Sequence, residues 1–259
     1  MSRRCKELDP FAGWTAPKGA TTVRRRRPAP TRPPLNTTEL LLLVPVLLFA
    51  FVAHEYAHAY AALKQGDPTA YQLGRLTFNP LKHIDPVMTV IVPAVMLFTS
   101  GTFFGGAKPV PVESRNFRHF KRGDIIVSLA GVATNFALVP ACALLAVVFG
   151  VLGQRVPALA PSLAVLQLMM VLGVQVNLSL GIFNLLPLPP LDGSHVFKYL
   201  LPPAWALQYQ QLGRFGFLLL FALISFAPQV LRTWMAPVRV VFDVTQNVVG
   251  PFLLPSPLG

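Results

Sequence analysis

Residues 40–63 read LLLLVPVLLFAFVAHEYAHAYAAL, and His54-Glu55-Tyr56-Ala57-His58 interrupts this apolar run with ionisable side chains. Residues four apart share one face of a helix, so His54 and His58 point the same way. Two imidazoles at this spacing can bind one Zn²⁺, and Glu55 stands beside them to act on water at the metal. Ionisable groups inside a membrane span are costly and rare. The cluster is therefore a candidate functional site rather than two histidines satisfied by neighbouring helices.

The composition is typical of a polytopic membrane protein. Of the 259 residues, 53% are hydrophobic and only 12% are charged, which is about half the charge of a soluble domain. Lys and Arg outnumber Asp and Glu by 22 to 10. No nucleic-acid motif accompanies this basic excess, so we expect anionic lipid head groups of the bilayer, and no nucleic acid, as its partner. The predicted fold class is an all-α polytopic membrane protein.

Three parts of the chain differ in composition. Residues 1–36 are rich in Arg and Pro and predict a disordered basic tail. Residues 37–228 hold the long apolar segments and the candidate site, and they predict an intramembrane domain. Residues 229–259 mix charged side chains with Val, Trp and Phe, which predicts an interfacial C-terminal segment.

The apolar segments predict about four to five transmembrane helices. The first begins at a start signal formed by Asn36 and Glu39 and runs to about Lys64, a length of about 40 Å that is enough to span a bilayer. Further helices are predicted at 125–152, 161–186 and 212–226. Residues 87–104 are apolar but barely long enough to cross, and we expect them to enter the membrane and return as a re-entrant segment.

A catalytic zinc ion usually has three protein ligands and one open position, so the two histidines need a third partner. The acidic and histidine candidates are His83, Asp85, Glu113, His119, Asp124, Asp192 and His195. Most of these lie in polar loops, where a solvated side chain is the simpler interpretation. Asp192 follows a membrane span on backbone broken by prolines, and loose backbone at membrane depth is typical of a buried site. His195 is the second candidate, because imidazole is a common zinc ligand.

Two motifs together resemble the site-2 protease family of intramembrane zinc metalloproteases. The first is His54-Glu55-x-x-His58 in an apolar helix, and the second is Asn184-x-x-Pro187-x-Pro189-x-Leu191-Asp192-Gly193. The likeness covers about residues 38–200 and corresponds to a compact form without appended sensory domains. The pair of motifs is far more specific than either motif alone.

This resemblance implies a Zn²⁺ cofactor held by His54, His58 and Asp192, a catalytic core of three helices, and Glu55 as general base. It implies that Asn184 supports substrate or the backbone near the metal. The family pattern in the second core helix is Ala-Gly-Pro followed by Asn, and here Asn135 is kept while Val replaces Pro. The implied activity is that of a zinc metalloendopeptidase, which hydrolyses a peptide bond in or near a transmembrane segment of another membrane protein.

Extended backbone near the site predicts how that substrate could bind. Pro109 and Pro111 favour an extended segment, and an unwound substrate could pair with this segment and with the 87–104 insertion by strand addition. The sequence defines neither the identity of the substrate nor the oligomeric state.

The expected ligands constrain the topology of the chain. Asp192 can reach the histidines only if the first helix and the 161–186 helix end on the same side of the membrane. The region Lys64–Arg122, with eight basic residues, then shares that side, and the positive-inside rule makes it cytoplasmic. The same rule disfavours the basic tail on the outer side. We expect an integral protein of the bacterial cell membrane, with its active site nearer the cytoplasmic face.

Two other functions deserve comparison with proteolysis. A proton- or ion-handling transporter would use intramembrane His, Glu and Asp as a relay, which predicts polar residues along several spans. A catalytically silent pseudoprotease would keep the fold in order to bind partners. Zinc content separates the transporter from the enzyme, and the behaviour of Glu55→Gln separates the pseudoprotease from it.

Overall fold

The computed structural model describes residues 37–91 and 105–255, and within these residues it has helices and loops but no β-strand. Four stretches of the described part are long and apolar enough to cross a membrane: Leu40–Gln65, Phe120–Arg155, Pro157–Asn184 and Pro203–Phe226. The all-α polytopic membrane class is confirmed. The tail 1–36 and most of the expected re-entrant segment, residues 92–104, lie outside the described residues, so both expectations stay predictions.

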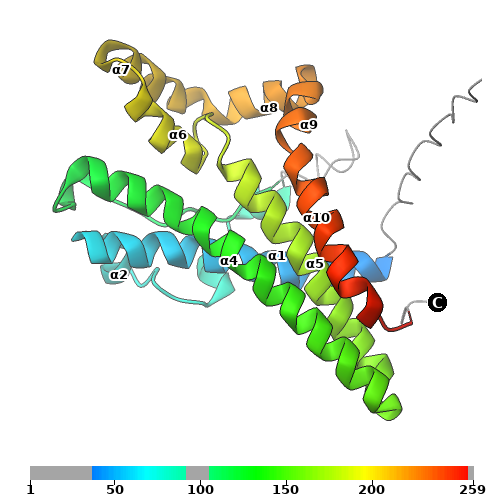
Figure 1. Ribbon diagram of the computed structural model, residues 1–259. Helices are drawn as coiled ribbons and strands as arrows, with labels where there is room; N and C mark the ends of the chain where they lie inside the picture. Colours follow the sequence, from blue (N-terminus) through cyan, green and yellow to red (C-terminus); the bar gives the residue numbers. More distant parts are fainter. Residues whose placement is uncertain (1–36, 92–104, 256–259) are drawn as a thin grey trace, which may run out of the picture. The chain divides into compact units, whose positions relative to one another are not determined.

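Three helices form the core around the candidate site: α1 (Thr37–Gln65), α4 (Phe120–Arg155) and α5 (Ala160–Asn184). They pack against one another in all three combinations (Figure 1). Small residues let these helices approach closely, as is common in membranes. A Cβ atom on Gly173 of α5, for example, would lie 2.9 Å from Sγ of Cys142 on α4. The three-helix core predicted from the resemblance is therefore present.

Apolar contacts fix the relative direction of the core helices. Val46 and Ala50 of α1 pack against Val176 of α5, and Ala62, near the end of α1, packs against Val127 near the start of α4. Because the end of α1 contacts the start of α4, the two helices run antiparallel. The end of α1 that carries the two histidines consequently faces the first half of α4.

A glycine ends α1. Gly66 has a φ of 111°, its N–H donates to Leu63 O, and the N–H of Asp67 donates to Ala62 O. This is the Schellman arrangement, in which the left-handed residue is normally glycine. The fully buried Asp67 carboxylate then accepts from Asn116 Nδ2 and from the N–H of Glu113, each at 2.8 Å.

Those hydrogen bonds tie the loop before α4 to the end of α1. Burial alone would raise the pKa of Asp67, but the hydrogen bonds from Asn116, Thr69 and Glu113 outweigh it and lower the pKa. The carboxylate therefore stays ionised and keeps the loop in place. Shorter elements complete this region: α2 (Thr69–Gln72), η1 (Pro80–Lys82), η2 (Pro86–Ile91) and η3 (Ser114–Asn116).

After α5 the chain makes an irregular turn over residues 185–191 and continues through short helices. Their bounds are α6 (Asp192–Phe197), η5 (Lys198–Leu200), α7 (Pro203–Gln211), η6 (Leu212–Phe215), α8 (Gly216–Phe226), α9 (Pro228–Trp234), α10 (Ala236–Val249) and η7 (Gly250–Phe252). One further short helix, η4 (Pro157–Leu159), lies between α4 and α5. The helix expected at 212–226 is therefore preceded by helical turns from Pro203 onward. Val238 and Phe242 of α10 pack on the α4–α5 pair. The interfacial placement of residues 229–259 stays a prediction.

Candidate metal centre

Three side chains from distant parts of the sequence meet between α1, α4 and α6. Nε2 of His54 lies 3.0 Å from Nε2 of His58. Oδ2 of Asp192 lies 3.1 Å from the first nitrogen and 3.3 Å from the second. The histidines are buried, with 6% and 8% of their surface exposed. Asp192 itself opens the short helix α6 instead of lying on irregular backbone as expected, and the proline-rich turn ends directly before it.

The hydrogen-bond partners of the two Nδ1 atoms determine which nitrogen of each ring carries the proton. Nδ1 of His58 is 2.7 Å from the carbonyl oxygen of Val127, which can only accept, so this nitrogen donates. Nδ1 of His54 donates in the same way to Oδ1 of Asn135 at 3.1 Å. A neutral imidazole protonated at Nδ1 has a lone pair on Nε2. Two lone pairs and a carboxylate oxygen then face one another, and a cation between them would relieve the repulsion.

The spacing of these three atoms fits zinc. Ligand atoms about 2.1 Å from a tetrahedral zinc ion lie roughly 3.4 Å apart, close to the separations of 3.0, 3.1 and 3.3 Å in the structure. Oδ2 of Asp192 is buried and has no hydrogen-bond partner among the described residues. His54, His58 and Asp192 could therefore hold one ion and leave a fourth position open, as catalytic zinc sites do.

A glycine of α4 leaves room for the two imidazoles. A Cβ atom on Gly131 would lie 2.5 Å from Nε2 of His58 and 2.7 Å from Nε2 of His54. Gly131 belongs to a run of small residues, Ala130 to Asn135, for which the sequence predicted only close helix packing. The structure shows that the missing side chain also keeps open the space that the ligand atoms face.

Glu55, the predicted general base, is held by the segment that precedes α4. Its Oε2 accepts a hydrogen bond from the N–H of Val110 at 2.8 Å. Pro109 and Pro111 have no N–H, so this is the single backbone donor of the tripeptide. The N–H of Val110 is thus already engaged by Glu55, and the strand addition expected at this segment stays a prediction.

The other candidates for the third ligand have different partners. Nδ1 of His195 lies 3.3 Å from Oδ1 of Asp124, Nε2 of His83 lies 2.9 Å from Thr77 O, and Glu113 caps η3. Within the described residues, neither histidine belongs to the group that can hold a metal. Asp192 is thus the candidate that the fold brings to the histidines.

The two asparagines expected to support the site differ in their contacts. Asn135 is fully buried and contacts the ring of His54. Asn184 donates from Nδ2 to Leu180 O of its own helix at 3.0 Å. That hydrogen bond does not link Asn184 to the metal ligands, and its role in the site stays a prediction.

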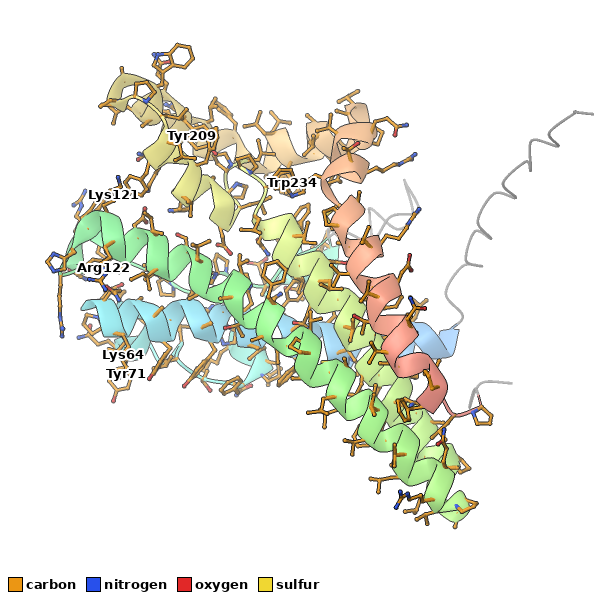
Figure 2. All side chains as sticks on the ribbon, viewed as in Figure 1. Lys64, Tyr71, Lys121, Arg122, Tyr209 and Trp234 are labelled. Atoms are coloured by element: carbon orange, nitrogen blue, oxygen red, sulfur yellow. The ribbon has the colours of Figure 1, made fainter. Side chains whose placement is uncertain are left out.

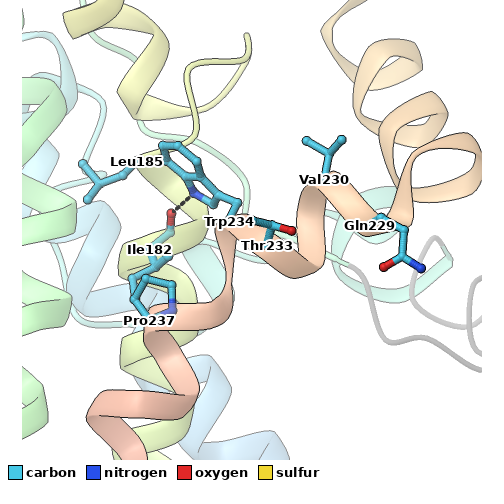
Figure 3. A pocket seen from close by; sticks show the side chains of 7 residues that line it. All are labelled: Ile182, Leu185, Gln229, Val230, Thr233, Trp234 and Pro237. Atoms are coloured by element: carbon cyan, nitrogen blue, oxygen red, sulfur yellow. Dashed lines mark hydrogen bonds between the residues drawn. The ribbon is translucent and has the colours of Figure 1, made fainter.

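A hollow of about 750 Å³ lies elsewhere, beside the end of α5 and the start of α10 (Figure 3). It is lined by Ile182, Leu185, Gln229, Val230, Thr233, Trp234 and Pro237. Nε1 of Trp234 donates to Ile182 O at 2.8 Å and so joins α9 to α5. Its lining is mostly apolar and includes none of the metal-ligand candidates.

Curated proteins similar to this chain are named as zinc metalloproteases. "Putative zinc metalloprotease YwhC" of Bacillus subtilis (strain 168) is 39% identical over 181 residues, which cover 70% of this chain and 78% of the relative. "Putative zinc metalloprotease Rip2" of Mycolicibacterium smegmatis is 29% identical over 203 residues, or 78% of this chain and 73% of the relative. The Rip2 protein of Mycobacterium tuberculosis (strain ATCC 25618 / H37Rv) is 30% identical over 190 residues, which cover 72% of this chain and 67% of the relative. No family model and no solved structure matches the chain.

The membrane-capable helices, the group of two histidines and one aspartate, and these relatives define a zinc metalloprotease that is an integral membrane protein. The similarity to YwhC extends over most of both chains. The chain therefore belongs to the site-2 protease family, and its cofactor is zinc.

Proposed function

We propose that this protein is an intramembrane metalloendopeptidase that hydrolyses a peptide bond in or near a transmembrane segment of another membrane protein. The observation that carries the proposal is the meeting of His54, His58 and Asp192, whose ligand atoms lie 3.0, 3.1 and 3.3 Å apart. Glu55 adjoins the first of these residues on α1. Three metal ligands and a neighbouring carboxylate are the groups that hydrolysis by a zinc protease requires.

Each side chain has one task in the proposed reaction. Bound zinc would polarise the scissile carbonyl and make water more acidic. Glu55 accepts the proton of the attacking water and delivers it to the leaving amine. The N–H of Val110 fixes one oxygen of the Glu55 carboxylate, which leaves the other oxygen to receive the proton. Val127 and Asn135 hold the two imidazoles with their lone pairs inward.

The substrate must unwind before it can react. A transmembrane helix satisfies its own carbonyl groups by hydrogen bonds within the helix, so the scissile carbonyl is not free in an intact helix. We therefore propose a substrate segment that is locally extended at the cleavage site. Membrane segments with helix-breaking residues meet this requirement better than uniformly apolar ones.

Basic side chains support an orientation in the membrane. Lys64 at the end of α1 and Lys121 and Arg122 at the start of α4 lie at the same end of the antiparallel pair (Figure 2). The positive-inside rule places this end in the cytoplasm. Because His58 lies nearer to this end than to the start of α1, we propose a site nearer the cytoplasmic face. The relatives are bacterial proteins, and we propose the bacterial cell membrane as the location.

The test is metal analysis of the purified full-length protein, followed by incubation with a panel of membrane-spanning substrates in lipid nanodiscs. We expect one zinc ion per chain in the wild type and in Glu55→Gln, and a loss of cleavage of about 100-fold or more in the variant. Glu113→Gln, which changes a half-exposed glutamate, is the matched control and should cleave normally.

Each contrary result points to a different function. Equal cleavage by Glu55→Gln and wild type would show that Glu55 takes no part in the reaction. Zinc without cleavage of any substrate, together with full rescue of a deletion strain by Glu55→Gln, would favour the pseudoprotease. A protein without zinc that moves ions into sealed proteoliposomes would favour the transporter.

A further inference from the structure

A second buried polar cluster lies beside the metal group, around Asp124 near the start of α4. Asp124 is only 6% exposed. It receives hydrogen bonds from Lys198 Nζ at 2.6 Å and Tyr199 OH at 2.8 Å, and Nδ1 of His195 lies 3.3 Å away. All three partners come from the stretch that directly follows Asp192. The cluster therefore connects α4 to the segment that carries the third ligand.

The same helix, α4, also contacts the other two ligands. The carbonyl of Val127 binds the ring of His58, and the side chain of Asn135 binds the ring of His54. Asp124 is one helical turn before Val127, on the same stretch of α4. One continuous helix thus contacts the two halves of the metal group, although these halves are far apart in the sequence.

Local backbone structure does not fix the orientation of the helix that begins at Asp192. The residues from Leu185 to Leu191 form no regular helix, and the chain resumes helical structure only at Asp192, in a helix of six residues. So short a helix is not stable by itself. Its orientation must come from tertiary contacts, and the Asp124 cluster supplies charged ones at its far end.

We propose that Asp124 is a positioning residue: by binding His195, Lys198 and Tyr199 it sets the direction of α6, so that Asp192 reaches the two imidazoles. The proposal rests on the metal site described above, but not on the proteolytic activity. A buried ion pair contributes little net stability compared with apolar packing, yet it can restrict the geometry of the groups it joins. The cluster is therefore better suited to positioning than to strengthening the fold.

Zinc affinity of the full-length protein, measured by competition with a chromophoric chelator, tests the proposal. Changing a residue behind a metal ligand typically lowers metal affinity 10- to 100-fold. We expect a fall within about this range for Asp124→Asn, with a changed visible spectrum when Co²⁺ replaces zinc. Asp243→Asn, on the exposed side of α10, is the matched control and should bind zinc like the wild type.

A double-mutant cycle separates positioning of Asp192 from a general structural role. In an Asp192→Ala background the positioned ligand is absent, so Asp124→Asn should cause no further loss of zinc affinity. Equal losses in both backgrounds would overturn the proposal, because Asp124 would then act on the whole site and not through Asp192. An unchanged affinity in Asp124→Asn alone would overturn it as well.

A milder variant covers the case in which Asp124→Asn does not fold. Tyr199→Phe removes one hydrogen bond to Asp124 and keeps the ring. We expect a smaller loss of zinc affinity, of a few fold, that again disappears in the Asp192→Ala background. A loss that persists there would contradict the proposal. Because the readout is metal binding, these outcomes are independent of whether any substrate is cleaved.

Discussion

At the scale of single residues, the metal group depends on atoms that have no chemical signature in the sequence. Val127 contributes a backbone carbonyl that any residue could offer, and Gly131 contributes the absence of a side chain. Both matter because of their place on α4. The candidate ligands His54 and His58, in contrast, are recognisable by residue type and spacing alone.

Gly131→Ala should strongly weaken zinc binding while leaving the helices intact. Its Cβ atom would occupy the space within 2.7 Å of both ligand nitrogens, so the imidazoles could not converge on an ion. We expect zinc affinity to fall about 100-fold, which is the upper end of the range for a change outside the ligands themselves. Metal analysis and circular dichroism of the purified variant check both parts.

Gly250→Ala is the control for this substitution. A Cβ atom on Gly250 meets no other atom within 4 Å, so the variant should keep its zinc. A Gly131→Ala protein that binds zinc as tightly as the wild type would show that the ion lies away from α4.

At the scale of elements, the helices of the core follow from local patterns. The expected bounds 36–64, 125–152 and 161–186 lie inside or close to α1, α4 and α5. Long apolar runs and breaks such as Gly66 and Pro157 suffice to define them. The segment around Pro109–Pro111 is different, because its function depends on which partner its backbone finds.

Val110→Pro tests the hydrogen bond between this segment and Glu55. The substitution removes the N–H that the carboxylate accepts from, and proline suits a position between two extended prolines. We expect normal zinc content and a fall in kcat of about 10- to 100-fold, since loss of a supporting hydrogen bond displaces the catalytic group.

Val110→Ala keeps the backbone donor and should retain kcat. Steady-state kinetics on one cleavable substrate compare the two variants. Equal rates for Val110→Pro and Val110→Ala would mean that this hydrogen bond does not position the base.

At the scale of the whole molecule, the antiparallel core puts the basic loops at the end of α1 that carries the histidines. The loop before α4 and the turn after it lie at opposite ends of this spanning helix. We expect the loop in the cytoplasm and the turn outside the cell.

Cysteine labelling measures this orientation. In a variant with Cys5 and Cys142 changed to Ser, a membrane-impermeant maleimide should label Gln154→Cys in intact bacterial cells. It should label Arg115→Cys only after the cells are permeabilised. The reverse pattern would contradict the proposed cytoplasmic position of the site.

The membrane class, the core helices and the pair of histidines can be predicted from the sequence, because apolar run length and four-residue spacing are local properties of the chain. It also favoured Asp192 as the third ligand, with His195 as the second candidate. The tertiary structure brings Asp192, and not His195, to the two histidines: α4 lies close enough to α1 for Val127 and Asn135 to orient both rings, and Asp124 contacts His195. Such choices depend on contacts between residues distant in the chain, whose distances follow from helix packing and not from any local pattern.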